Sequence, residues 1–364
     1  MAPVIVKESV NKHIYGALRS QATVSHPLDV QDTYNPMPDQ KPKSNAPSEN
    51  ETRIRERISA QKSLLLGTAV GDALGVPVEF HDRESLRKNP VTGIRGYGSH
   101  NQPPGTFSDD TSLTLCLAES LTRGFDLQDQ GRLFVKWLKD DYWTARGELF
   151  DIGISTDRAL TVISRGVPPE QAGVTEENAN GNGSLMRISP LLFHLLDKPA
   201  EERFHLTRLT SGVTHAHIRS VVGCYYYLDY LKALYDGHTP AQAHEQLCES
   251  MPEKLTKFGA EPDEIRIYDR LFSNKFGTLP EPEIHSSGYV VHTLEASVWC
   301  LLTTSSYPEA VLKAVNLGDD TDTTGAVTGA MAGLYYGMSA IPEEWLAVLA
   351  KRDEIESLAE KVWG

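Results

Sequence analysis

Apolar residues recur every three or four positions along most of the chain, which is the spacing of one buried helical face. The first such segment begins at Glu51 and ends near Gly75 and Pro77, and Ser108 is placed to cap a second helix that runs through Leu121. Further helices are predicted over residues 127–143, 155–165, 184–197, 200–213, 216–236, 240–250, 263–273, 289–304, 307–316, 322–338 and 342–361. Alternating Val/Ile-rich segments bounded by turns are nearly absent, so we expect an all-α fold.

The first fifty residues differ in composition from the rest. Residues 20–50 are rich in Pro, Gln, Asn, Ser and Asp, which is typical of a linker or arm. Apolar residues nevertheless lie near the N-terminal end: Val4, Ile5, Val6, Ile14, Tyr15 and Leu18. We therefore divide the chain into an N-terminal extended arm or linker, residues 1–50, and a multi-helix domain, residues 51–364.

The net charge is -14, and the first fifty residues contribute equal numbers of acidic and basic side chains. The whole negative excess therefore lies in the domain, which argues against a nucleic-acid partner because that would need a basic face. The four cysteines have no short spacing, and no N-terminal apolar segment has the length of a signal peptide. We expect a cytoplasmic protein with reduced cysteines.

An uncharged segment runs from Thr323 to Ile341, with glycines at 325, 329, 333 and 337. Its length approaches that of a membrane span, but acidic residues stand at its entrance and no second apolar span exists. Glycines four residues apart form one ridge, which allows two helices to approach closely. We expect a tightly packed central helix and no membrane partner. Residues 67, 71 and 75 form a second glycine ridge.

The strongest chemical signal precedes that helix. Three carboxylates and three hydroxyls fall within residues 319–324, and Ser108-Asp109-Asp110-Thr111 offers the same oxygen-only ligands about two hundred residues earlier. Crowded like charges are costly unless a cation neutralises them, and oxygen ligands favour Mg²⁺ over zinc. Two such segments make one dinuclear site if the fold brings them together. Taken singly, each is also explained as a solvated acidic loop or a helix cap.

Three other segments carry candidate chemistry. Glu79 follows Pro77 on a predicted loop above the end of the first helix. The loop Asn182-Gly183-Ser184 is predicted to open a helix, where glycines and free amides suit a phosphate; an ordinary capped turn explains it equally well. Asp151 precedes another helix, where an Asp cap is the default explanation.

These segments, in this order, resemble the ADP-ribosylglycohydrolases, specifically the type related to the dinitrogenase-reductase-activating glycohydrolase. The motifs that carry the resemblance are Gly71-Asp72-Ala73-Leu74-Gly75 with Glu79, Ser108–Thr111, Asp151-Ile152-Gly153, Gly181–Arg187, Thr214-His215 and Gly318–Gly325. The resemblance covers roughly residues 57–361 and leaves the arm outside. It implies an all-α enzyme that binds two Mg²⁺ or Mn²⁺ ions and removes ADP-ribose from modified protein side chains.

The resemblance also implies roles for individual residues. The metal ligands would be Ser108, Asp109, Asp110, Asp320, Asp322 and Thr323. Catalysis would involve Glu79, Asp109, Asp151 and Asp320. The substrate would contact Asn182, Gly183 and Ser184 through its diphosphate and distal ribose, His215 through a ribose, and Gly288 and Tyr289 near the phosphates and adenosine.

Three positions depart from the family pattern. Ser108 stands where threonine is common, Asp319 where many members have glycine, and His292 where an acid is expected. Asp151 matches the acid of members that act on ADP-ribosyl-arginine, so we favour arginine over serine linkage.

Two other classes of function stay open. A metal-dependent phosphohydrolase would use the same oxygen ligands, and a non-catalytic binding protein could use the same fold. Some members of the family act as immunity proteins against ADP-ribosylating toxins. The arm, residues 1–50, could therefore bind an ADP-ribosyltransferase toxin, pack on its own domain or mediate a dimer.

Overall fold

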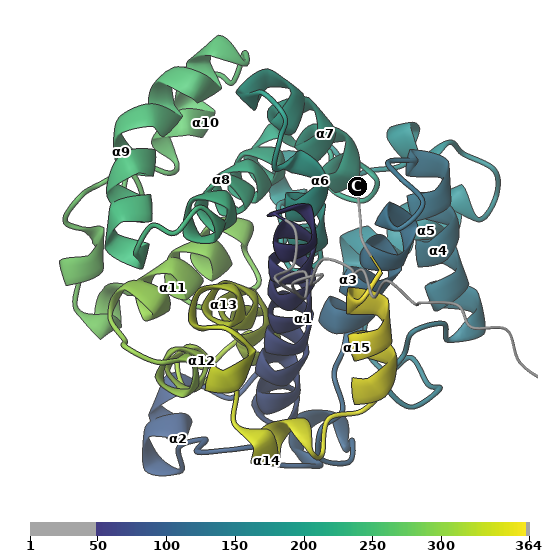
Figure 1. The fold of residues 1–364 in the computed structure, drawn as a ribbon, viewed down its shortest axis with the longest axis vertical. Coiled ribbons are helices and arrows are strands. Elements are labelled where there is room, and N and C mark those ends of the chain that lie inside the picture. The colour runs from purple at the N-terminus through teal and green to yellow at the C-terminus, as the bar shows by residue number, and fades with distance from the viewer. Residues whose placement is uncertain (1–48, 362–364) are drawn as a thin grey trace, which may run out of the picture. The chain divides into compact units, whose positions relative to one another are not determined.

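The computed structural model describes residues 49–361, and these residues fold into helices joined by loops (Figure 1). No strand occurs among them; the backbone forms only isolated bridges, such as Gly181 with Tyr289. The all-α prediction is confirmed. The α-helices are α1 Glu49–Gly75, α2 Arg83–Lys88, α3 Asp109–Leu121, α4 Leu127–Asp140, α5 Ile154–Ile163, α6 Leu192–Leu195, α7 Ala200–Gly212, α8 Ile218–Tyr235, α9 Pro240–Lys257, α10 Pro262–Arg266, α11 Val290–Leu302, α12 Tyr307–Val315, α13 Thr321–Tyr336, α14 Glu343–Leu346 and α15 Arg352–Ala359.

Helices α1 and α13 form a closely packed pair at the centre of the domain (Figure 1). The two glycine ridges face each other: a Cβ atom built on Gly71 would lie 2.6 Å from the carbonyl carbon of Gly325. One built on Gly329 would lie 2.9 Å from the carbonyl carbon of Gly67. Neither position has room for a side chain. The predicted ridges are confirmed except at Gly337, which ends α13 with a φ of 79° and has open space around it.

The remaining helices surround this pair. Helices α11 and α12 pack against α13, and α3 and α15 pack against α1. Helix α4 packs on α3, and α8 contacts α7, α9 and α11. Long segments of chain therefore separate elements that lie side by side, and the first turns of α3 and α13 are brought to one region. No helix among residues 49–361 is long and apolar enough to cross a membrane.

Several helix boundaries differ from the prediction. The segment 184–197 is not one helix: turns follow Ser184, and Pro190 lies in a short 3₁₀ turn, Ser189–Leu191, before α6. Proline lacks the N–H that would continue a helix. The segment 342–361 is split into α14 and α15, with Lys351 in the left-handed region at a φ of 54°. Helix α10 ends at Arg266, well before the predicted residue 273, and α9 continues to Lys257 rather than ending at 250.

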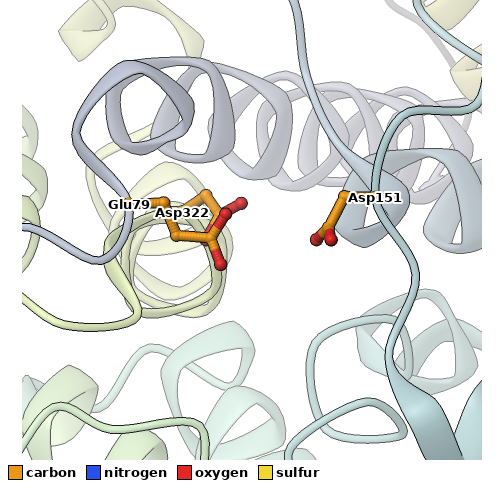
Figure 2. A group of neighbouring side chains, drawn as sticks. All are labelled: Glu79, Asp151 and Asp322. Atoms are coloured by element: carbon orange, nitrogen blue, oxygen red, sulfur yellow. The ribbon is translucent and has the colours of Figure 1, made fainter. Parts of the chain in front are cut away.

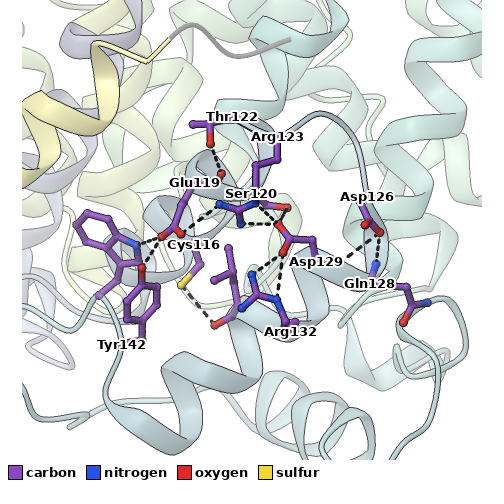
Figure 3. Close-up of polar contacts among 12 residues, drawn as sticks. Cys116, Glu119, Ser120, Thr122, Arg123, Asp126, Gln128, Asp129, Arg132 and Tyr142 are labelled. Carbon is purple, nitrogen blue, oxygen red and sulfur yellow. Dashed lines mark hydrogen bonds and ion pairs between the residues drawn. The ribbon is translucent and has the colours of Figure 1, made fainter.

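A polar network fixes the connection that follows α4 (Figure 3). Glu119 of α3 accepts hydrogen bonds from the Tyr142 hydroxyl at 2.7 Å and from Trp143 Nε1 at 2.8 Å. Arg123 pairs with Glu119 and with Asp129 of α4. The chain after α4 is therefore anchored to α3 before it continues to the segment 148–153 that precedes α5.

Candidate active site

The first turns of α3 and α13 contribute to one cavity of about 640 Å³. Asp109 lies in the first turn of α3, and Asp320 and Thr323 flank the start of α13. The free N–H groups at a helix N-terminus carry partial positive charge, which favours carboxylates there. The cavity is lined by nine of the residues singled out in the sequence: Glu79, Asp109, Asp151, Asn182, Gly183, His215, Gly288, Asp320 and Thr323.

Three carboxylates meet beside this cavity (Figure 2). One oxygen each from Glu79, Asp151 and Asp322 lie within 4.8 Å of one another, close enough to share a cation. Asp322 is in the first turn of α13, whereas Glu79 and Asp151 come from loops. Glu79 and Asp322 are buried and Asp151 is half-buried.

Asp110 lies behind the cavity and joins the two acidic segments. Its Oδ2 accepts from the Ser108 hydroxyl at 3.0 Å and from the Thr323 hydroxyl at 3.3 Å. The Ser108 hydroxyl also accepts from the Asp110 N–H, so Ser108 is the N-cap of α3, as expected. Two buried carboxylate oxygens, Oδ1 of Asp110 and Oδ1 of Asp320, have no hydrogen-bond partner among the described residues.

Burial dominates the electrostatics of this cluster. It raises the pKa values of Asp109, Asp110 and Asp322 well above the usual range, and neighbouring carboxylates add to the rise. Buried anions without cationic partners are costly, and unpartnered buried oxygens are rare. An all-oxygen donor set with two such oxygens fits a hard divalent cation. The described residues thus form a buried acidic cluster that could hold metal.

Asp72 supports the cluster from α1, a role that was not assigned from the sequence. Its carboxylate accepts from the Ser108 N–H at 2.9 Å, the Thr111 N–H at 3.0 Å and the Thr111 hydroxyl at 2.6 Å. Burial raises the pKa of Asp72 to about 7. The sequence signal that could have revealed this role is the position of Asp72 as a single acid in a glycine-rich helix, because close packing of that helix must bury the acid. Asp72 ties the first turn of α3 to the central helix pair.

His100 is the second residue that the sequence did not reveal. Its Nε2 contacts Glu79 Oε2, and its ring packs between Phe80 and Phe150, with centroids 5.9 and 5.2 Å away. The Ser99 hydroxyl donates to the Glu79 carbonyl at 2.6 Å. The loop that carries Glu79 is thereby held from a neighbouring loop. No sequence spacing connects residues that are twenty-one positions apart in two irregular loops.

Asp319 has a backbone role. Its φ is 62°, a left-handed conformation that glycine, Asn and Asp adopt most readily. Its carbonyl accepts from the Phe80 N–H at 2.7 Å, and its N–H donates to the His81 carbonyl at 2.8 Å. The exposed residue Asp319 therefore joins the loop of Glu79 to the start of α13.

Asn182 connects the cavity wall to the acidic cluster. Its side-chain Nδ2 donates to Asp320 Oδ2 and to the Thr293 hydroxyl, both at 2.8 Å, and its N–H donates to the Gly288 carbonyl at 3.0 Å. A Cβ atom on Gly288 would lie 2.9 Å from Asp320 Oδ2, so a larger residue there would displace that carboxylate. The prediction that this loop opens a helix is wrong, because turns follow Ser184. Asn182 instead forms part of the cavity wall.

His215 also lines the cavity, beside the glycine loop, with its ring buried. Its Nδ1 lies 2.8 Å from the Thr214 hydroxyl. Burial, together with the nearby charge of Arg187, lowers the pKa of His215 to about 3. The ring is therefore neutral near pH 7. His292, the other unusual histidine, lies 2.7 Å from the Ser287 hydroxyl through Nδ1 and is outside the cavity lining.

Two predicted substrate-binding residues do not line the cavity. Ser184 is fully buried behind the loop, with its hydroxyl 2.9 Å from that of Ser211. Tyr289 is half-buried at the N-cap of α11, and its ring packs edge-on against His292.

Asp151 is not a helix cap: α5 begins after Gly153, where no side chain caps it. The default explanation for Asp151 is therefore wrong.

Known proteins resemble this chain over nearly the whole described domain. A family model for ADP-ribosylglycohydrolase matches residues 50–364. ADP-ribosylarginine hydrolase Tri1 of Serratia proteamaculans (strain 568) is 32% identical over 311 residues, which cover 85% of this chain and 80% of that protein. ADP-ribosyl-[dinitrogen reductase] glycohydrolase of Rhodospirillum rubrum is 29% identical over 304 residues, covering 80% and 90%. A solved structure of an ADP-ribosylglycohydrolase-related protein complex is 34% identical with a TM-score of 0.69, covering 85% of this chain and 98% of that one.

Proposed function

Because the chain belongs to the ADP-ribosylglycohydrolase family, we propose that it removes ADP-ribose from arginine side chains of modified proteins. The observation that carries the proposal is the convergence of Glu79, Asp109, Asp151 and Asp320 on one cavity together with Asn182 and His215. Separate loops and helices supply these residues, which suits a site that must hold both a reacting bond and a nucleotide. The similarity to ADP-ribosylarginine hydrolase Tri1 and to ADP-ribosyl-[dinitrogen reductase] glycohydrolase supports the same proposal.

The reaction suits a carboxylate-lined cavity. Hydrolysis breaks the bond between ribose C1 and the guanidinium nitrogen, joins a water oxygen to C1, and returns a proton to the leaving nitrogen. Positive charge develops on the ribose as that bond lengthens, and nearby carboxylates stabilise it. We assign Glu79 to accept the proton of the water, because burial raises its pKa and a base works best near the working pH.

The acidic cluster would hold the metals. Ser108, Asp109, Asp110, Asp320, Asp322 and Thr323 are the proposed ligands for two Mg²⁺ or Mn²⁺ ions. Glu79 and Asp151 each have an oxygen within 4.8 Å of Asp322 and keep their separate roles toward the water and the leaving group. Bound divalent ions would hold ribose hydroxyls and increase the acidity of water. The protein itself fixes the cluster through Asp72 and Asn182.

Asp151 is the proposed contact for the leaving group. Its side chain makes no hydrogen bond among the described residues, so it is available to a guanidinium in the two-pronged geometry that arginine prefers. Phe80 and Ile154 also line the cavity and are 72% and 81% exposed. Such exposed apolar side chains beside the opening suit a substrate that is itself a protein.

Release of ADP-ribose from arginine-linked and serine-linked peptides tests this proposal. We expect the arginine-linked peptide to be cleaved at least about tenfold faster. Asp151→Asn is expected to lower arginine-linked turnover while calorimetry with free ADP-ribose shows nearly unchanged affinity. Preference for the serine-linked peptide, or equal loss of turnover and affinity in Asp151→Asn, would contradict the assignment. Release of phosphate instead of ADP-ribose would indicate a phosphohydrolase.

The arm, residues 1–50, lies almost entirely outside the described residues, and the family match begins only at residue 50. On its composition alone, we propose that it binds an ADP-ribosyltransferase whose product this enzyme reverses, as an immunity protein would. Catalytically impaired Asp109→Ala protein is then expected to bind and inhibit that transferase, whereas protein that lacks residues 1–48 hydrolyses normally and binds it weakly. Unchanged binding after the deletion would reject this role.

A further inference from the structure

Arg187 is a fully buried arginine without an acidic partner among the described residues. Its Nη2 atom donates to the Thr210 carbonyl at 3.1 Å and to the Thr214 hydroxyl at 2.9 Å, and its guanidinium packs over the Phe134 ring at 4.5 Å. Its Nε and Nη1 atoms have no hydrogen-bond partner within residues 49–361. Burying a cation without an opposite charge costs folding free energy, which suggests that the contact between Arg187 and Thr214 has a function.

The direction of the hydrogen bonds follows from the chemistry of the groups. A guanidinium only donates, so the Thr214 oxygen must accept from Arg187. The Thr214 hydroxyl has one hydrogen of its own, and the only other partner of that oxygen among the described residues is Nδ1 of His215, at 2.8 Å. The Thr214 oxygen has a second lone pair that could accept from an Nδ1–H, but its own buried hydrogen would then have no acceptor among the described residues, so we take Nδ1 as the acceptor. In a neutral imidazole the proton consequently resides on Nε2.

The ring turns its Nε2–Cε1 edge, and with it the second nitrogen, toward the glycine loop of the cavity. A Cβ atom on Gly181 would lie 3.8 Å from Nε2, and one on Gly183 would lie 3.3 Å from it, so this edge faces the glycine loop that lines the cavity. Nε2 forms no hydrogen bond with the described residues. The Ser211 hydroxyl lies 2.9 Å from the His215 carbonyl and 2.9 Å from the Ser184 hydroxyl, which holds the ring and the loop together.

We propose that Arg187 and Thr214 are positioning residues that fix His215 in the neutral tautomer protonated on Nε2, so that it donates a hydrogen bond to an oxygen of the ligand. The tautomer follows from the contacts of the protein alone; the identity of the ligand as ADP-ribose rests on the proposed function. A histidine held in this way cannot accept a hydrogen bond from the ligand through Nε2. The cavity would therefore select an acceptor oxygen, such as that of a ribose hydroxyl or a phosphate, at this point.

Long-range ¹H–¹⁵N correlation spectra of protein labelled at histidine test the tautomer directly. We expect the His215 signals, assigned by their loss in His215→Gln, to show a neutral ring with the proton on Nε2. Thr214→Val preserves the shape of the side chain but removes the hydroxyl, so the proton is expected to redistribute between the two nitrogens. Thr214→Ser is expected to restore the original pattern. A wild-type ring protonated on Nδ1 would overturn the proposal, whether or not the variants fold.

Binding of free ADP-ribose, measured by calorimetry, tests the consequence. We expect Thr214→Val to weaken binding about tenfold, the effect of one misdirected hydrogen bond, and Thr214→Ser to recover most of it. Thr210→Val is the matched control, because in the part of the chain that the structure describes the Thr210 hydroxyl has no hydrogen-bond partner, and Arg187 bonds to the Thr210 carbonyl instead. Wild-type affinity and tautomer in Thr214→Val would reject the role of Thr214. Failure of the wild-type protein to bind ADP-ribose would instead contradict the proposed function and leave the spectroscopic result standing.

Discussion

At the scale of single residues, the site depends on positions where no side chain fits. A Cβ atom on Gly183 would lie 2.8 Å from Cε1 of His215 and 3.0 Å from the Thr156 hydroxyl, both buried. We therefore expect Gly183→Ala to displace the His215 ring and weaken ADP-ribose binding about tenfold, measured by calorimetry.

Gly181→Ala provides the control for that measurement. An added Cβ atom there would meet its nearest neighbours only at 3.7 and 3.8 Å, which is ordinary contact. Because Gly181 itself lines the cavity, we expect some loss of ADP-ribose affinity there, but clearly less than in Gly183→Ala, since no protein atom is displaced. Similar losses in both variants would mean that the backbone freedom of the loop, and not the room beside His215, sets the affinity.

The residue types of the site were accessible from the sequence, but their contacts were not. Two segments rich in carboxylates and hydroxyls predicted an oxygen-lined metal site, and the structure brings the starts of α3 and α13 together through Asp110 and Thr323. The roles of Asp72 and His100 depend on which loop or helix faces which, and no periodicity encodes that. Ser184 matched a motif, yet its side chain turns into the interior. The metals and the assigned roles stay predictions.

At the scale of elements, the glycine ridges of α1 and α13 allow backbone contact. Alanine is the better helix former, but a methyl group on Gly329 would lie 2.9 Å from the Gly67 carbonyl carbon. We expect Gly329→Ala to destabilise the protein by about 3 kcal/mol or more, because two packed backbones must separate. The melting temperature is expected to be at least about 4 °C lower.

Gly212→Ala is the matched helical control, since the added Cβ atom would have the methyl group of Ala216 as its nearest neighbour, 3.9 Å away. Its melting temperature is expected to equal or slightly exceed that of the wild-type protein. The prediction about the ridge would be wrong if Gly329→Ala melted like this control.

The helical spacing predicted most elements because long amphipathic or apolar segments bury one face whatever their partners. It failed where local chemistry overrides spacing. Pro190 interrupts the segment after the glycine loop, and Lys351 adopts a left-handed conformation between α14 and α15. Both glycine ridges were predicted, but the pairing of α1 with α13 was not. The spacing of residues along one helix shows which face is flat, but it does not show which other helix packs on that face.

At the scale of the whole molecule, the buried acidic cluster couples stability to pH. Burial raises the pKa of Asp72 from 3.8 to about 7 and raises those of Asp109, Asp110 and Asp322. The metal-free folded protein thus retains protons that the unfolded chain has already released. Its stability therefore falls as pH rises from the ordinary pKa of these carboxyls through their raised pKa values. Above pH 6.5, the ordinary pKa of histidine, the opposing effect of buried neutral rings such as His215 has largely ended.

We expect the melting temperature of chelator-treated protein to fall by about 5 °C or more between pH 6.5 and about 8. Saturating Mg²⁺ should remove most of this fall, because a cation that binds the ionised cluster stabilises the folded state. A melting temperature that rises with pH over this range in the absence of metal would contradict the account of the cluster.

The most direct test of the central claim is the release of ADP-ribose from an arginine-linked peptide by chelator-treated protein, followed as Mg²⁺ or Mn²⁺ is added back. We expect no turnover without metal, recovery when either ion is added, and a loss of at least about a hundredfold in Asp109→Ala or Asp322→Ala. Each substitution removes one carboxylate of the cluster. Full turnover in the presence of chelator, or by either variant, would contradict the claim that this cluster performs the reaction.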